Sequence, residues 1–177
     1  MIDELVGVGM SAELIVVIMS ALPVAELRGS LPVAIKLLSL PWYQALYLAI
    51  IGNLLPVPFL LVFFNSLAKV VGRIDTGKRW LDWLFKRTRW GTTVVEKYKS
   101  IGLMVLIAIP VPGTGAWTGA VIAFLSGLKF GRAFLSIVAG VTVSGVIVTA
   151  LSLMGWTGAI IAGLGLSIVV ILGLWKA

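Results

Sequence analysis

Long apolar stretches dominate the pattern along this chain, and two of them are interrupted. Residues 42–68, 131–153 and 156–176 are continuous apolar stretches, and an α-helix needs about 20 such residues to cross a bilayer. Residues 12–40 and 101–128 are also apolar, but proline and glycine break each of them near its middle. The pattern predicts an all-α integral membrane protein with three full spans and two interrupted segments.

The two interrupted segments are related by an internal repeat. An offset of 87 positions places Pro23 on Pro110 and repeats the order of interrupted segment, short turn and full span. Paired interrupted segments in corresponding halves are typical of transporters whose binding site lies between repeats. The sequence therefore predicts one membrane domain over 1–177, with a first repeat over 1–68 and a second over 101–153.

Basic residues decide how these elements cross the membrane. Nine of the 14 Lys and Arg lie in 69–100, interleaved with Trp and Phe, which indicates an interfacial helix or a solvated linker on the cytoplasmic side. If both interrupted segments are hairpins that return to the face they entered, Lys129, Arg132 and Lys176 also lie inside. Kinked spans would place those three outside. The positive-inside rule therefore favours two re-entrant hairpins inserted from opposite faces, which is an inverted repeat.

Composition narrows the function classes. The chain is 60% hydrophobic and 12% charged, against about 45–50% and about 25% in soluble domains. It has no His and no Cys, which removes the usual zinc ligands, thiol nucleophiles and the Ser-His-Asp triad. We therefore expect no enzyme, no metal site and no cofactor, and we ascribe the net charge of +7 to the membrane surface rather than to nucleic acid.

The first break carries two charges that need a partner or a task. Glu26 and Arg28 would lie at membrane depth, where a charge costs at least ~2.5–3.5 kcal/mol. The Arg28 fork matches a phosphate or carboxylate, and a half-helix beginning at Gly29, followed by Ser30, would direct its positive end at an anion. Glu26 can exchange a proton, because burial favours its neutral form and Arg28 its charged form. The alternative is a permanent Glu26–Arg28 ion pair that only pins the hairpin.

The second break carries small and polar groups without charge. Gly113 and Gly115 allow tight backbone geometry, Thr114 supplies a hydroxyl and Trp117 a flat wall, and a second half-helix is predicted to begin at Gly115. A simple chain reversal that needs small residues is the alternative. Unpaired backbone at membrane depth requires protein or water around it, so the two tips are expected to meet near the midplane.

Asn53 is a polar residue in the middle of the span predicted over 42–68. It is expected either to line the cavity or to satisfy backbone groups freed by Pro56 and Pro58, which also predict a kink. The pairs Gly140/Ser144 and Gly158/Ala162 have the spacing of helix-packing faces, which a homodimer could also use.

The stretches Leu22-Pro-Val-Ala-Glu-Leu-Arg-Gly-Ser-Leu-Pro32 and Pro110-Val-Pro-Gly-Thr-Gly-Ala-Trp-Thr-Gly119 resemble the small multidrug export protein family of bacteria and archaea. The family is distantly similar to the DedA, or SNARE-associated, membrane proteins, which have two re-entrant hairpins with essential acidic and basic residues. By this resemblance, Glu26 and Arg28 match that acid–base pair, whereas the second tip lacks the arginine usual in DedA proteins. The resemblance implies a multi-pass protein of the cell (inner) membrane.

Three functions follow as hypotheses. The first is ion-coupled transport or flipping of an anionic lipid-like substrate, a polyprenyl-phosphate or phospholipid, since some DedA-like proteins are implicated in moving such carriers. Protons or sodium would be the coupling ion and membrane lipids the other partners. The second is proton-coupled export of small lipophilic cationic drugs, with Glu26 as the counter-ion. The third is a structural membrane protein that transports nothing.

Overall fold

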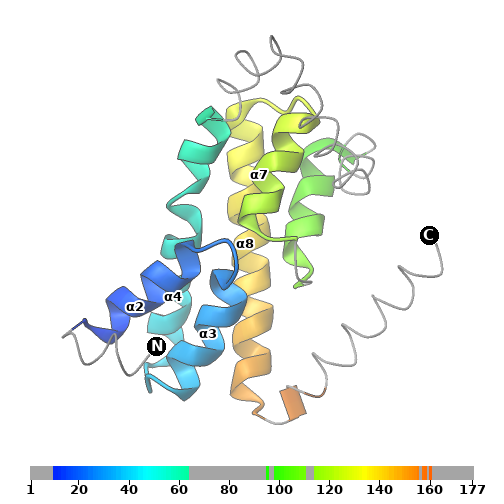
Figure 1. Ribbon diagram of the computed structural model, residues 1–177. Coiled ribbons are helices and arrows are strands. Elements are labelled where there is room, and N and C mark those ends of the chain that lie inside the picture. Colours follow the sequence, from blue (N-terminus) through cyan, green and yellow to red (C-terminus); the bar gives the residue numbers. More distant parts are fainter. Residues whose placement is uncertain are drawn as a thin grey trace. The chain divides into compact units, whose positions relative to one another are not determined.

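The computed structural model describes residues 10–63, 95, 98–110, 114–155, 157, 158 and 160, and within them every regular element is a helix. Most of the predicted interfacial segment 69–100 and of the predicted last span 156–176 lies outside these residues. The all-α class is confirmed. The labelled helices, in order, are α2 (Ala12–Ala21), α3 (Glu26–Lys36), α4 (Trp42–Leu54), α7 (Ala116–Leu125) and α8 (Phe130–Leu153) (Figure 1).

The first interrupted segment folds as a helical hairpin of α2 and α3. Helix α2 begins after Ser11, whose Oγ accepts a hydrogen bond from the Leu14 amide at 3.4 Å, a typical N-cap. The chain leaves the helix at Leu22 and reverses direction before α3 (Figure 1). Because proline cannot continue the α2 hydrogen-bond ladder, Pro23 in the turn explains why the apolar run does not form one rod.

The second interrupted segment has the same plan. Helix Tyr98–Ala108 leads into the break, and α7 leaves it after Gly115, the N-cap residue. The two helices touch where Gly119 of α7 faces Ile107, whose Cδ1 would lie 2.5 Å from a Cβ at Gly119. A larger residue at this position would require the Ile107 side chain to move. Beyond α7, Gly127 adopts φ 65°, the left-handed conformation with which many helices end.

The observed helices recur at the offset that relates the two breaks. The positions of Pro23 and Pro110 differ by 87. Adding this offset to the bounds of α2 gives 99–108, which lies within helix Tyr98–Ala108. The same offset carries α4 to 129–141, the first part of α8. The repeat in the sequence is thus a repeat of elements, whereas its inverted insertion stays a prediction.

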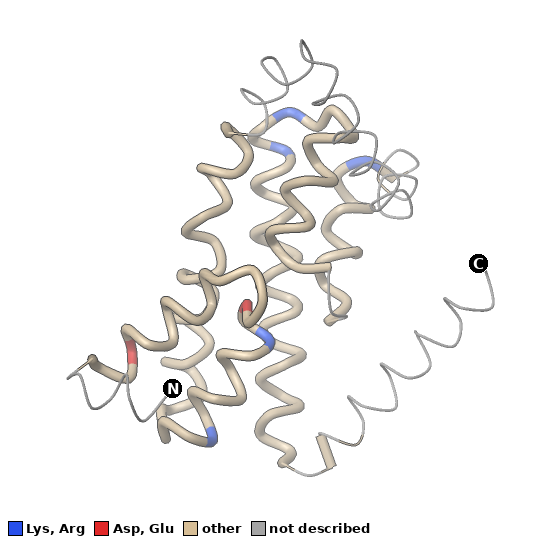
Figure 2. The backbone as a smooth tube through the Cα atoms, viewed as in Figure 1, with Lys and Arg blue, Asp and Glu red and all other residues tan. Residues whose placement is uncertain are grey.

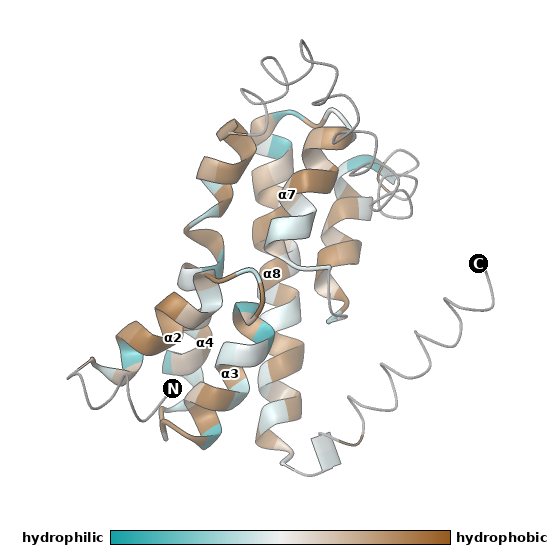
Figure 3. Ribbon diagram, viewed as in Figure 1, coloured by the Kyte–Doolittle hydropathy of each residue, from teal (hydrophilic) through white to brown (hydrophobic). Residues whose placement is uncertain are grey.

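Two helices have the length and composition to cross a membrane, Trp42–Phe63 and Phe130–Leu153. The first is interrupted at Leu55 and Pro56, where the prolines predicted a kink. Only 33% and 44% of their most apolar windows are buried, too little for the core helices of a soluble protein. Apolar residues dominate the described helices (Figure 3). Many of their large side chains are exposed, as expected of a surface that faces lipid, among them Leu14, Ile18, Tyr47, Phe59, Val62, Leu135, Val146 and Ile147.

The chain divides into two compact units, one up to Ile51 and from Gly145 onward, the other Gly52–Ser144. In the second unit, α8 approaches helix Tyr98–Ala108 at Gly140, where a Cβ would lie 2.8 Å from the Met104 carbonyl oxygen. The predicted small-residue face at Gly140 is therefore a packing point within the chain.

In the first unit, α8 carries a corresponding glycine, Gly145. A Cβ there would lie 2.9 Å from Leu46 Cδ1 and 3.5 Å from Leu27 Cδ1. Leu27 is fully buried and stands between the two charged residues of the first break. This contact therefore fixes the start of α3 against α4 and α8.

Candidate functional site

Glu26 is a buried acid at the first residue of α3. Its exposed fraction is 8%, and its amide donates a hydrogen bond to the Leu22 carbonyl oxygen at 3.0 Å. Its φ is 47°, a left-handed conformation that costs a non-glycine residue about 1–3 kcal/mol and that clusters at functional sites. A helical hairpin can form without a buried acid or a strained backbone at its turn. These two features of Glu26 therefore need another explanation.

Arg28 is the cation that accompanies this acid. It is half-buried, and the charge of Glu26 acts on its guanidinium. Figure 2 shows a red and a blue segment next to each other at the start of α3. An acid and a base two residues apart at a helix start can neutralise each other, and the acid also interacts favourably with the positive end of the helix.

Helix α3 begins three residues earlier than the sequence predicted. The predicted start at Gly29 is wrong, since the Gly29 amide already donates to the Ala25 carbonyl oxygen at 2.8 Å within the first turn. Glutamate is favourable in a first helical turn, so the helix extends back to Glu26. Pro32, taken from the sequence as part of the break, lies inside α3.

Ser30 is held by a residue that the sequence did not single out. Its hydroxyl and that of Ser20 on α2 form a hydrogen bond, and both residues are fully buried. The bond joins the two arms of the first hairpin one turn from Glu26. Ser20 is a polar residue in an otherwise apolar run. The sequence does not show that its hydroxyl faces Ser30, which becomes visible only in the folded hairpin.

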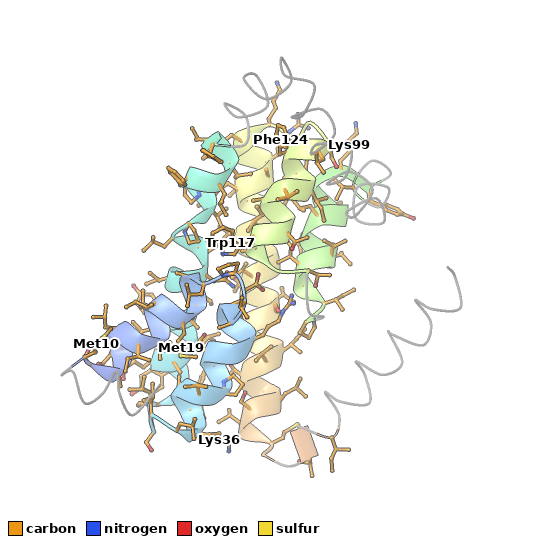
Figure 4. The ribbon with its side chains drawn as sticks, in the orientation of Figure 1. Met10, Met19, Lys36, Lys99, Trp117 and Phe124 are labelled. Carbon is orange, nitrogen blue, oxygen red and sulfur yellow. The ribbon has the colours of Figure 1, made fainter. Side chains whose placement is uncertain are left out.

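The second break is closed by its own hydroxyl group. Thr114 Oγ1 donates to the Ile109 carbonyl oxygen at 3.1 Å, so it joins the two sides of the break. Gly115 is buried and caps α7 as predicted. Trp117 projects half-buried from the first turn of α7 (Figure 4). Gly113 lies outside the described residues.

Asn53 is fully buried in α4. Its Oδ1 and Nδ2 have no hydrogen-bond partner within the described part of the chain. Nearly all buried polar groups in proteins are satisfied, so this amide is unusual. One role predicted for Asn53 was a hydrogen bond to the backbone groups that Pro56 and Pro58 leave free. Its side chain makes no such bond among the described residues.

Three hydroxyl groups of α8 behave differently from one another. Thr142 Oγ1 donates to the Val138 carbonyl oxygen at 2.8 Å, a bond back to its own helix that threonine commonly makes. The hydroxyls of Ser144 and Thr149 are buried and have no partner among the described residues. Thr149 escaped the sequence analysis, because a lone threonine in an apolar helix gives no signal.

The predicted site residues fall into separate groups. Glu26, Arg28, Gly29 and Ser30 share the first five residues of α3 in one unit. In the other unit, Thr114, Gly115 and Trp117 surround the start of α7, while Asn53 lies on α4. Whether the two breaks meet stays a prediction. Among the described residues no group of three His, Cys, Asp or Glu could hold a metal ion.

The chemistry available at α3 is therefore ionic. A buried acid beside a half-buried guanidinium can bind or release a proton and can present either charge to a ligand.

Comparisons with known proteins agree with this picture. The model of a family described as "Putative small multi-drug export protein" matches residues 26–147, which run from Glu26, the first residue of α3, through the second break. Neither curated proteins nor solved structures gave a match, and the likeness to DedA proteins stays a prediction from the motifs. Since the match covers more than half of an apolar, all-helical chain, the protein belongs to the small multi-drug export protein family and is a membrane protein.

Proposed function

We propose that this protein is a secondary transporter of the cell membrane that exports small lipophilic molecules, with Glu26 as its proton-exchanging acid. One observation carries the proposal. Glu26 is a buried residue, 8% exposed, at the break of a helical hairpin in a chain of an export family. Ionisable groups inside membrane segments mostly serve ion or substrate pathways.

The exchange of a proton for a substrate follows from the chemistry of the carboxylate. Glu26 is negative only without its proton, so a lipophilic cation and a proton compete for it. Burial favours the protonated form, and Arg28 with the positive helix end favours the ionised form. This balance allows a proton gradient to drive the exchange, and the apolar exposed helices are compatible with substrates that partition into lipid.

A second candidate is an anionic lipid-like substrate, a polyprenyl-phosphate or a phospholipid. The observation in its favour is that Arg28, as a whole residue, is more exposed than Glu26, although its Nε is buried. Its fork matches a phosphate. Protonation of Glu26 would then remove the competing carboxylate and let Arg28 bind the headgroup.

Re-entrant insertion of the two hairpins belongs to the same proposal. We propose that the chain crosses the membrane several times with 69–100 in the cytoplasm, in a bacterium or archaeon, and that its two breaks enter from opposite faces. The support is the distribution of Lys and Arg under the positive-inside rule and the recurrence of the helices at one offset. A homodimer is compatible with this arrangement but is not needed for it.

Flux into proteoliposomes tests the transport function and its substrate. With a fluorescent lipophilic cation and an imposed proton gradient, we expect Glu26→Gln to abolish proton-driven flux, because a glutamine amide cannot bind and release the proton that the carboxylate exchanges. Glu13→Gln is the matched control. Glu13 is also an acid on the first hairpin, but it is only half-buried and accepts a bond from Gln44 at 3.4 Å. Its variant should stay within about twofold of the native rate.

Arg28→Ala separates the two substrates. Intact cation flux in this variant favours drug export, whereas loss of transport of a polyprenyl-phosphate, with cation flux absent throughout, favours the anionic substrate. If Glu26→Gln and Arg28→Ala both fold and both transport like the native chain, neither charge carries the transport function. If the native chain moves neither substrate, the transport proposal is wrong and a structural role stands in its place.

A further inference from the structure

The span Trp42–Phe63 contains a polar group that neither the charges of α3 nor the packing of the helices explains. Asn53 has an exposed fraction of 0%, and both polar atoms of its amide lack a hydrogen-bond partner among the described residues. Leaving such a group unsatisfied costs about 1–3 kcal/mol. A leucine would fill the place without this cost, so the amide has a task that protein atoms of the described chain do not fulfil.

The backbone around Asn53 offers further oxygens. Proline has no N–H to give to the carbonyl four residues before it. Pro56 therefore leaves the carbonyl oxygen of Gly52 without its helical donor, and Pro58 does the same for Leu54. These two residues flank Asn53 in the sequence. Helix α4 ends at Leu54. The helix resumes after Pro56, whose carbonyl oxygen accepts a hydrogen bond from the Leu60 amide at 2.9 Å.

The sign of the charge that suits this place is set by the helix. The C-terminal end of a helix carries a partial negative charge, equivalent to roughly half an electron charge. Broken membrane helices bind Na⁺ with unwound carbonyl oxygens and helix C-terminal ends. In α4 this end lies in mid-span beside a buried amide oxygen. The oxygens are neutral and no described acid lies within the span, so a monovalent hard cation fits better than Ca²⁺ or Mg²⁺, which favour carboxylates.

We propose that Asn53, with the main-chain carbonyl oxygens of Gly52 and Leu54, binds a sodium ion at the break of α4. The site lies within one compact unit, Gly52–Ser144. It does not depend on the proton-exchanging role of Glu26, and sodium binding can be measured whether or not the protein transports anything. A bound ion would satisfy the carbonyl oxygens that the prolines free and the Asn53 oxygen at once.

Thermal unfolding of the purified full chain in detergent tests the site. Samples in NaCl, KCl and choline chloride are compared at equal ionic strength. A ligand that binds only the folded state raises the unfolding temperature with its concentration. We expect Na⁺ at about 100 times its dissociation constant to raise the unfolding temperature by about 5 °C over choline, and K⁺ to raise it less.

Two variants examine the ligands and one serves as a matched control. Asn53→Leu should raise the unfolding temperature in choline, because it removes the unsatisfied amide, and should abolish the response to Na⁺. Pro56→Ala restores a donor for the Gly52 carbonyl oxygen and should weaken the response about tenfold in Na⁺ concentration. The control is Thr149→Val, which removes another buried, unpartnered polar atom but from a continuous helix, and it should respond to Na⁺ like the native chain.

The proposal has clear contrary outcomes. Equal unfolding temperatures in NaCl, KCl and choline chloride would show that no sodium ion binds the folded chain, and the proposal would be wrong. An undiminished Na⁺ response in Asn53→Leu would place any sodium site elsewhere. If Glu26→Gln loses transport but keeps its Na⁺ response, the sodium site at Asn53 is supported. Its role would then be independent of proton exchange at Glu26.

Discussion

The two helical hairpins share one plan but close their breaks in different ways. In the first, the turn leads into a strained, buried acid with a cation two residues on. In the second, the break is uncharged, and the Thr114 hydroxyl joins its two sides by a hydrogen bond to Ile109. The shared plan shows that proline and small residues suffice to build a hairpin. The charges of the first hairpin are therefore an addition to the fold, and it is there that chemistry is expected.

The arms of the two hairpins are also joined differently. The first uses a buried hydrogen bond between Ser20 and Ser30, and the second a close approach of Ile107 to Gly119. A polar joint needs both partners, whereas a glycine contact needs only the absence of a side chain. Substitutions in the first hairpin should therefore lower the free energy of unfolding by breaking a hydrogen bond. Substitutions in the second should lower it by introducing a steric clash.

The largest expected contrast concerns the side of the membrane on which each hairpin opens. The chain has no native cysteine, so Ser39→Cys and Ser126→Cys can be labelled one at a time in oriented vesicles with a reagent that does not cross membranes. These positions follow α3 and α7 and correspond under the offset that relates the hairpins. We expect one to label only from outside and the other only from inside. Labelling of both from one face would contradict opposite insertion.

The next contrast concerns the charges of the first break. Arg28→Ala removes the cation on which the charge of the buried Glu26 acts, and leaving a buried charge uncompensated costs about 3–5 kcal/mol. Since Arg28 is only half-buried, we expect a loss of about 2–3 kcal/mol in the free energy of unfolding. The double variant with Glu26→Gln should recover most of it. Thermal unfolding in detergent measures both, and equal losses in the single and double variants would show that the charges do not interact.

Glycine substitutions in α8 compare the packing of the two units. Gly140→Ala places a Cβ 2.8 Å from a backbone oxygen and 2.7 Å from Ile107 Cβ, neither of which can move alone. We expect a loss of about 2 kcal/mol. Gly145→Ala meets the end of a flexible leucine side chain at 2.9 Å, so its loss should be about half as large. The reverse order of unfolding temperatures would contradict this reading of the contacts.

The smallest contrast separates the hydroxyl groups. Ser20→Ala leaves the buried Ser30 hydroxyl without its partner, for a loss of about 1–2 kcal/mol. Thr114→Val removes an exposed bond, and water can replace it at a cost of about 0.5 kcal/mol. Paired unfolding curves test the difference, and the double variant Ser20→Ala with Ser30→Ala should lie closer to the native chain than the single one. A larger effect of Thr114→Val would mean that the second break carries the stricter geometry.

Much of the fold could be predicted from the sequence, because its signals are local. Continuous apolar stretches gave the two long helices, and Pro23 and Pro110 marked the breaks. Pro56 marked the interruption of α4. The predicted start of α3 at Gly29 was wrong, since the Gly29 amide already belongs to the first helical turn and a glutamate is favourable in such a turn. Ser20 and Thr149 were not recognised as notable, because a single polar letter does not tell which way a helix faces.

The sequence by itself determined that this chain belongs in a membrane, where it breaks and which residues are charged, since length, hydropathy and proline act on their immediate neighbours. Only the tertiary structure decided that Glu26 is buried on a strained backbone, that Ser20 faces Ser30 and that the Asn53 amide has no described partner. The reason is that burial and pairing depend on contacts between residues that lie far apart along the chain, and these form only when the helices pack.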